Sequence, residues 1–225
     1  IDTHTHLTDS AFNSETPQLI ARAQAAGVTR FVVPAVNGRS DESLFALCAD
    51  FPCCHPAIGL HPTEVKADFR KELETVERYA EQYKDRIVAI GEVGLDAHWS
   101  TEFMDEQMTA LEAQIEMALR GGLPLILHTR DAVPLMKETL SRYKGRGLKG
   151  VFHGYSGSVE TFRELEKLGD FYFGIGGVVT FKNARLAETV KAMPAERIVL
   201  ETDSPYLTPH PYRGRRNDSS HIPLI

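Results

Sequence analysis

Two kinds of hydrophobic pattern alternate along this chain. Short apolar runs, rich in Val, Ile and Leu, are typical of strands that are buried on both faces of a parallel sheet. We expect eight such strands, near residues 1–6, 30–36, 54–60, 87–92, 123–128, 150–153, 171–175 and 198–202. Between them, apolar residues recur at helical spacing, as Leu111 and Ile115 do. These patterns predict helices over residues 17–26, 40–51, 69–83, 102–120, 132–143, 159–168 and 186–193.

Strands that alternate with helices indicate right-handed βαβ units. Eight strands are the number that a (β/α)8 barrel, or TIM barrel, requires, and such barrels usually have about 250 residues. This chain has 225 residues, starts inside its first expected strand without an initiator Met, and shows no helical pattern after the eighth strand. We therefore expect an α/β fold, a TIM barrel in one domain over residues 1–225, with the closing C-terminal helix beyond residue 225. A doubly wound open sheet is the structural alternative.

Polar residues in the expected strands indicate a metal site. The first two are His4 and His6, in the first expected strand. Side chains two residues apart on a strand point the same way, so the two imidazoles face one point in space. Neutral imidazole is a common ligand for Zn and other transition ions. Two unrelated histidines are the alternative, because so short a motif carries little information alone.

Ligand-type residues recur where other strands are expected to end. Four later apolar runs lead into such a residue, namely Glu92, His128, His153 and Asp203. In a parallel barrel the carboxyl ends of all strands meet on one face, where the active sites of this architecture lie. We therefore expect residues far apart in the sequence to converge on one pocket.

This ligand set predicts two divalent cations per subunit. One cation is expected on His4, His6 and Asp203, the other on His128 and His153, with Glu92 bridging them through its two oxygens. Paired cations about 3.5–4 Å apart clamp a hydrolytic transition state and lower the pKa of a shared water. Mixed imidazole and carboxylate ligands leave Mg, Mn and Zn open. Asp203 is also the expected general base, and Glu201 on the same strand face is expected to support the site.

Composition and charge narrow the class of protein. Hydrophobic residues make up 42% and charged residues 25%, and no apolar run approaches the ~20 residues that span a bilayer. We expect no membrane association, no obligate protein partner and, because the 3 cysteines form no CxxC unit, a cytoplasmic location. A net charge of −6 argues against broad attraction to nucleic acid, although two divalent cations would reverse the local field at the pocket.

Short motifs run in order through nearly the whole chain: Asp2-Thr3-His4-Thr5-His6, Gly59-Leu60-His61-Pro62, Gly91-Glu92-Val93-Gly94-Leu95-Asp96, His128-Thr129-Arg130-Asp131-Ala132, His153-Gly154-Tyr155-Ser156-Gly157, Glu201-Thr202-Asp203-Ser204-Pro205-Tyr206-Leu207 and Arg213-Gly214-Arg215-Arg216-Asn217. Together they resemble the TatD family of metal-dependent deoxyribonucleases, within the amidohydrolase-like barrels. The resemblance implies a TIM barrel, the metal ligands given above, and hydrolysis of DNA phosphodiesters by a metal-activated water. It also implies that His61 is a catalytic residue near the scissile phosphate; a histidine packed in a loop is the alternative.

Two further sites are expected to contact the substrate. Arg130 lies just past a strand end, and Arg216 and Asn217 close a basic segment after the eighth strand. Arginine forms bidentate hydrogen bonds to phosphate, so we predict that these residues bind the DNA substrate. A solvated loop is the alternative for the basic segment. Family members often carry Glu-Pro after the Arg-Asn pair, whereas this chain has Asp218-Ser219.

Three classes of function remain open at this point. The leading interpretation is a two-metal phosphodiesterase that acts on DNA. The second is a barrel hydrolase of a small lactone, amide or ester, because the same activated water attacks carbon as well and fold does not fix function. The third, a non-catalytic metal-binding protein, would not need open coordination sites.

Overall fold

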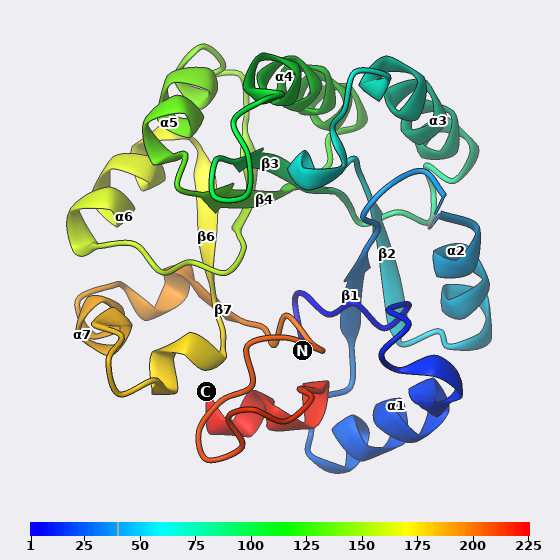
Figure 1. Cartoon of the computed structure of the whole chain (residues 1–225), viewed down its shortest axis with the longest axis vertical. Coiled ribbons are helices and arrows are strands. Elements are labelled where there is room, and N and C mark those ends of the chain that lie inside the picture. The colour runs from blue at the N-terminus through cyan, green and yellow to red at the C-terminus, as the bar shows by residue number, and fades with distance from the viewer. Residues whose placement is uncertain (40) are drawn as a thin grey trace.

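The computed structural model describes residues 1–39 and 41–225. Parallel strands pair in sequence order in a sheet that curls around a central axis (Figure 1). They are β1 (Phe31–Pro34), β2 (Cys54–Ile58), β3 (Ala89–Asp96), β4 (Leu125–Arg130), β5 (Lys149–Phe152), β6 (Asp170–Ile175) and β7 (Ile198–Leu200). The predicted TIM-like barrel of alternating strands and helices is confirmed.

Helices form the outer ring of the barrel (Figure 1). They are α1 (Thr16–Ala25), α2 (Asp41–Asp50), α3 (Phe69–Gln82), α4 (Met104–Gly121), α5 (Val133–Ser141), α6 (Val159–Leu165) and α7 (Leu186–Lys191). Each matches a predicted helix to within a few residues; residue 40, where the second was expected to begin, lies outside the described residues. Pro17 stands in the first turn of α1, where its missing N–H costs no hydrogen bond, and α4 ends before Gly122 in the left-handed conformation.

The first expected strand, residues 1–6, is not a regular strand. It forms only two isolated parallel bridges, Asp2 with Phe31 and Thr5 with Ser204. Its backbone nevertheless bonds to both neighbours: the N–H of Thr5 donates to Val32 O at 3.2 Å, and the N–H of His6 donates to Ser204 O at 2.9 Å. Segment 1–6 therefore lies between β1 and the chain that follows β7, and it closes the barrel in the place of an eighth strand.

A buried carboxylate explains why this segment is irregular. Asp2 is fully buried, and its Oδ1 accepts the backbone N–H groups of His4 at 3.2 Å and Thr202 at 3.0 Å. Its Oδ2 accepts the hydroxyl of Thr202 at 2.6 Å. Side-chain oxygens thus satisfy donors that a regular strand would pair with carbonyls.

Strand β3 extends beyond its predicted end at Glu92. All eight of its residues are buried, and its pairing with β4 shifts register between Ile90 and Val93. The shift lets the strand continue to Asp96, so Glu92 lies inside β3 instead of at its carboxyl end. A Cβ at Gly94 would collide with the carbonyl oxygen of His128, so only glycine permits this close approach of β3 to β4.

Aromatic and aliphatic side chains fill the layer between the sheet and the helices. Phe173 of β6 contacts Phe162 of α6 at 4.7 Å and Phe152 of β5 at 5.4 Å between ring centroids. Leu111 and Ile115, which predicted the amphipathic face of α4, are fully buried. Each such side chain contributes about 1.5–3 kcal/mol on burial, so this layer holds the helices against the sheet. Within the described residues, no helix has both the length and the apolarity to cross a membrane.

Candidate metal centre

The six predicted metal ligands come together around Glu92. Glu92 of β3 is their centre and is 2% exposed, and His4 in the closing segment is fully buried. The others follow from the strand order: His6 from the same segment, His128 from β4, His153 directly after β5, and Asp203 after β7. The barrel thus unites residues that are up to 199 positions apart, from His4 to Asp203, as the sequence predicted.

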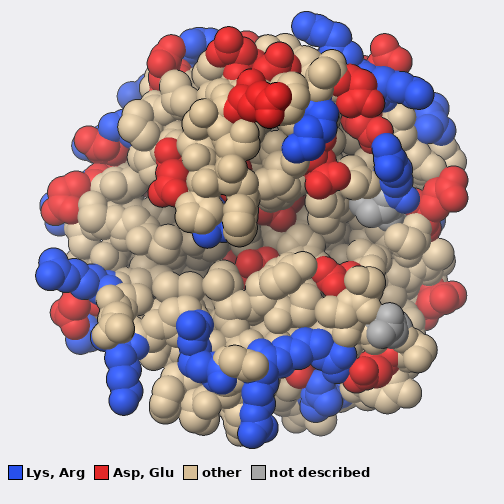
Figure 2. Space-filling model, in the orientation of Figure 1, with Lys and Arg blue, Asp and Glu red and all other residues tan. Residues whose placement is uncertain are grey.

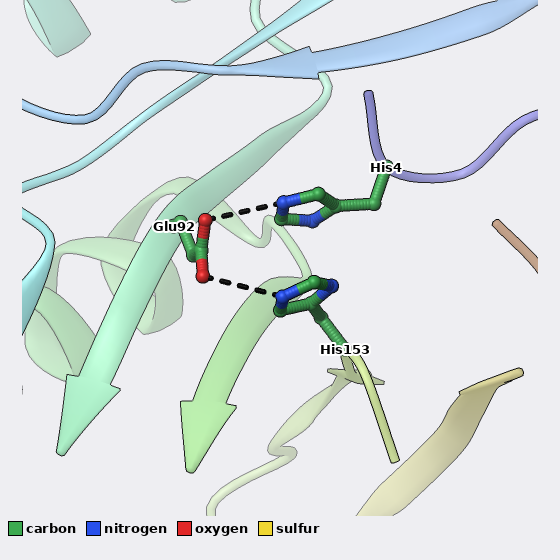
Figure 3. Close-up of side chains that lie close together, drawn as sticks. All are labelled: His4, Glu92 and His153. Atoms are coloured by element: carbon green, nitrogen blue, oxygen red, sulfur yellow. Dashed lines mark ion pairs between the residues drawn. The ribbon is translucent and has the colours of Figure 1, made fainter. Parts of the chain in front are cut away.

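The two oxygens of Glu92 face two different sets of imidazoles. Figure 3 shows this with His4 on one oxygen and His153 on the other. Oε2 lies 3.1 Å from His4 Nε2 and 3.7 Å from His6 Nε2. Oε1 lies 3.0 Å from His128 Nδ1 and 3.4 Å from His153 Nε2. A carboxylate that bridges two cations needs one oxygen for each cation, and the two oxygens of Glu92 meet this requirement.

Asp203 completes the first set. Its Oδ1 lies 3.3 Å from His6 Nε2 and 3.8 Å from His4 Nε2, and the two imidazole nitrogens are 3.2 Å apart. Three ligand atoms, one from each residue, lie within 4.8 Å of one another. Asp203 has a positive φ of 53°, an unusual backbone conformation for a non-glycine residue.

His61 also reaches Glu92, from the loop that follows β2. Its Nδ1 accepts the backbone N–H of Thr63 at 3.2 Å, so this nitrogen carries no proton in that hydrogen bond. The proton then sits on Nε2, which lies 3.2 Å from Glu92 Oε1. In this tautomer His61 is placed to donate a hydrogen bond into the pocket; its ligand atom also lies within 4.8 Å of those of Glu92 and His128.

Two carboxylates support the imidazoles from behind. Asp96 Oδ2 lies 2.9 Å from His128 Nε2, and Glu201 Oε1 lies 3.1 Å from His153 Nδ1. Carboxylates of this kind fix the tautomer and orientation of metal-binding histidines. The supporting place of Glu201 was predicted from the sequence and that of Asp96 was not; the available signal was the Gly94-Leu95-Asp96 motif, which ends four residues after Glu92.

The charges of the site favour a cation. Burial raises the pKa of Glu92, but the imidazoles of His61, His4 and His153 outweigh it and hold that pKa well below its usual range. The pKa of Asp203 is likewise lowered, chiefly by its hydrogen bond with His6 against the opposing effect of burial. Both carboxylates therefore stay ionised although the protein surrounds them.

The carboxylates in turn raise the pKa of two histidines. Burial lowers the pKa of His153, yet the charges of Glu201 and Glu92 raise it to about 10. Burial also lowers the pKa of His128, and hydrogen bonds with Asp96 and Glu92 raise it above its ordinary value. A cation binds only the deprotonated nitrogen of an imidazole, so a raised pKa makes cation binding depend on pH. Buried, convergent imidazole nitrogens and carboxylate oxygens fit divalent transition ions, so the donor set fits the predicted metal.

The three residues that were expected to contact the substrate lie in different environments. Arg130 is exposed at the end of β4, with its guanidinium 5.3 Å from the ring centre of Trp99. Arg216 is turned toward Glu15, with Nη2 to Oε2 at 2.6 Å. Asn217 is fully buried, and its amide donates to Thr202 O at 2.9 Å and Tyr206 O at 2.7 Å. Arg216 and Asn217 are thus not among the groups that surround Glu92.

The face seen in Figure 2 is hollowed at its centre, with acidic side chains inside the hollow and Lys and Arg along its lower edge. That edge lies over the loop that follows β7 in Figure 1. In this loop, Arg213 lies 3.5 Å over Phe181 and Arg215 lies 5.9 Å over Tyr212. Among the described residues, no carboxylate oxygen is within 4.0 Å of either guanidinium, so both charges remain available.

This chain is similar in sequence and in fold to several known proteins. The family described as TatD related DNase matches residues 1–225. The uncharacterized metal-dependent hydrolase YabD of Bacillus subtilis is 35% identical over 225 residues, 100% of this chain and 87% of that protein. The 3'-5' ssDNA/RNA exonuclease TatD of Klebsiella pneumoniae is 32% identical over 234 residues, 100% of this chain and 86% of that protein. The crystal structure of YjjV, a TatD homologue from Escherichia coli, superposes with a TM-score of 0.92 at 28% identity, covering 98% of this chain and 85% of that one.

Proposed function

The chain belongs to the family of TatD-related DNases, which includes metal-dependent hydrolases, and from that premise we propose that it hydrolyses phosphodiester bonds of DNA. The observation that carries the proposal is the position of Glu92, whose two oxygens face two separate sets of imidazoles. One bound ion would need only one such set. A bridging carboxylate is typical of paired cations, which serve the in-line displacement at phosphorus.

We assign one divalent cation to each set. His4, His6 and Asp203 would hold the first cation, His128 and His153 would hold the second, and Glu92 contacts both sets. When bound, such cations polarise the phosphoryl oxygens and lower the pKa of water. Mg, Mn and Zn all suit this donor set. Residues 1–225 act as one catalytic domain in this proposal.

Two side chains, Asp203 and His61, would move the proton and bind the phosphate. Asp203, ionised because its pKa is lowered, orients the attacking water and accepts its proton. His61 donates from Nε2 to a phosphate oxygen, because Thr63 occupies its other nitrogen. Both residues face Glu92 or its imidazoles, so a phosphate at the centre would meet them together.

The substrate class follows from the surroundings of the pocket. Arg130 stands at the end of β4, and Arg213 and Arg215 belong to the loop that follows β7; among the described residues, none of the three has a carboxylate oxygen within 4.0 Å. Free guanidiniums of this kind bind phosphates in bidentate fashion. A relative of 32% identity is named a 3'-5' ssDNA/RNA exonuclease. Direct contact by Arg216 and Asn217 stays a prediction; their hydrogen bonds favour a role in positioning the basic loop.

A substrate screen with defined metals tests the proposal. The chain is stripped with chelator, reloaded with Mg, Mn or Zn, and given labelled single-stranded and duplex oligonucleotides, a bis-aryl phosphate and a panel of lactones, amides and esters. We expect oligonucleotide cleavage that chelator abolishes and added metal restores. Efficient opening of a lactone without cleavage of DNA under any metal would replace the nuclease by a hydrolase of small substrates.

A further inference from the structure

A single tryptophan stands beside the metal centre. Trp99 is the only tryptophan of the chain, and 71% of its surface is exposed. Its loop is tied to the site: the backbone N–H groups of His98 and Trp99 donate to Asp96 Oδ1 at 2.9 and 3.3 Å, and Asp96 Oδ2 contacts His128. The backbone that carries the indole is therefore held by the same carboxylate that contacts His128.

The side chains of Arg130 and His98 lie next to the indole of Trp99. The guanidinium of Arg130 lies 5.3 Å from its ring centre, and His98 approaches it edge-on at 5.1 Å. His98 is held in turn by Asp131, with Nδ1 to Oδ2 at 2.8 Å. Among the described residues, no carboxylate oxygen is within 4.0 Å of the Arg130 guanidinium, although several acidic groups lie nearby. We call Trp99 and Arg130 the rim platform.

The rim platform borders a small pocket that runs back to Asp96. The pocket has a volume of about 120 Å³ and is lined, among others, by Thr63, Lys66, Trp99, Phe103 and Gln107. Lys66 lies 5.8 Å from the ring centre of Phe103. Aromatic surface and cationic groups therefore occur together next to the centre where a phosphate would react.

We propose that the rim platform stacks a nucleobase of single-stranded DNA beside the scissile phosphate. Every base has a π-face that stacks on an aromatic side chain, while arginine contacts the adjoining phosphate. A base within a duplex is already stacked on its neighbours and does not present that face, so the platform favours single strands or frayed ends. This inference rests on the proposed function, because it assigns a subsite to the same substrate.

The lone tryptophan supplies the test, because nucleobase stacking quenches indole fluorescence. The wild-type protein in chelator is titrated with a single-stranded thymidine oligonucleotide and with an abasic strand of equal length and charge, and binding is followed in parallel by fluorescence anisotropy. We expect quenching by the thymidine strand only. In metal-loaded protein, Trp99→Ala should weaken binding and raise KM about 5- to 100-fold, with Trp99→Phe retaining most of the affinity.

A matched control is available at the opposite end of the barrel. Tyr172 has 37% of its surface exposed and lies under the guanidinium of Arg197 at 5.6 Å, near the start of β6. Tyr172→Ala therefore removes an aromatic and cation pair far from the pocket and should leave KM unchanged. Equal quenching by the abasic strand, or equal KM for Trp99→Ala and Tyr172→Ala on DNA that is cleaved normally, would overturn the platform alone. Wild-type protein that cleaves no oligonucleotide under any metal would overturn the proposed function and the platform with it.

Discussion

The two halves of the candidate metal centre are built in different ways. His128 and His153, the strand half, come from the ends of regular strands, and each has a buried carboxylate on its second nitrogen. His4, His6 and Asp203, the closure half, come from irregular backbone where the barrel closes. Within the described residues, His4 Nδ1 is buried without a hydrogen-bond partner. Carboxylates thus contact the imidazoles of the strand half directly, whereas the closure half is positioned through its backbone, which the side chains of Asp2 and Asn217 hold by hydrogen bonds.

This difference predicts where each half is vulnerable. The strand half should fail when its supporting carboxylates are changed. The closure half should respond to the network that holds segment 1–6 against residues 201–206, in which Asp2 contacts Thr202 and Asn217 bonds to Thr202 and Tyr206. Glu92 belongs to both halves, so its replacement gives the largest effect.

Glu92→Ala should abolish binding of both cations and reduce turnover by at least ~10³-fold, since the cations supply several kcal/mol of transition-state stabilisation. Metal content per chain, measured by mass spectrometry after dialysis, checks this directly. Glu92→Gln keeps the shape of the side chain and should behave almost as poorly, because the charge is lost. A variant that retains two ions per chain and normal turnover would refute the bridge.

Asp203→Asn separates the halves. It keeps the size of the side chain but loses its charge and basicity, so turnover should fall by at least ~10²-fold. Because Asp203 lies 3.3 Å from His6, affinity should fall for one cation only, while the strand half keeps its own. Calorimetric titration of metal-free protein measures the two affinities; equal loss at both sites would show that the halves are not independent.

Asp96→Asn tests the strand half by removing the charge of the carboxylate that contacts His128. Loss of a carboxylate behind a metal-binding histidine typically costs 10–100-fold in metal affinity, and we expect about this loss for the cation on His128 and His153. The cation of the closure half should be unaffected. Asp170→Asn, which removes an exposed carboxylate paired with Arg197 at 2.6 Å at the other end of the strands, is the control. Unchanged affinity in Asp96→Asn would assign this carboxylate to loop structure alone.

The sequence predicted the ligands of both halves, but it predicted the backbone of β4 and β5 better than that of the closing segment. Regular β4 and β5 follow from apolar periodicity, so the places of His128 and His153 could be read directly. The irregularity of segment 1–6 depends on the bonds from Asp2 to Thr202, 200 residues away, which periodicity does not contain. The same holds for Arg216, whose partners Ala11 and Glu15 are about as distant in sequence. The extension of β3 past Glu92 depends on a register shift against β4, so Asp96 was missed.

The smallest expected effect concerns the segment behind the closure half. Asp218 caps the 3₁₀ turn Ser219–Leu224 by accepting Ser220 N–H at 3.0 Å, and it pairs with Arg22 of α1 at 2.6 Å. Burial raises the pKa of Asp218, but hydrogen bonds from Ser220 and Arg22 outweigh it and lower that pKa below 3.8. A depressed carboxyl pKa adds stability above the unfolded-state value, and this stability is lost as pH falls through the folded-state value.

Asp218→Asn keeps a capping side chain and removes the charge. At pH 7 we expect it to lower the free energy of unfolding by about 1 kcal/mol, a modest value because 52% of the Arg22 side chain is exposed and water screens the pair. The difference from wild type should shrink below pH 4, where the wild-type carboxyl begins to take up its proton. Urea unfolding of metal-free protein at several pH values measures this difference in the free energy of unfolding. Arg22→Ala should lower the free energy of unfolding by a similar amount, and the two losses should not add in the double variant. A difference that persists unchanged at the lowest pH would assign the effect to packing, and the closure half would then be anchored without help from this ion pair.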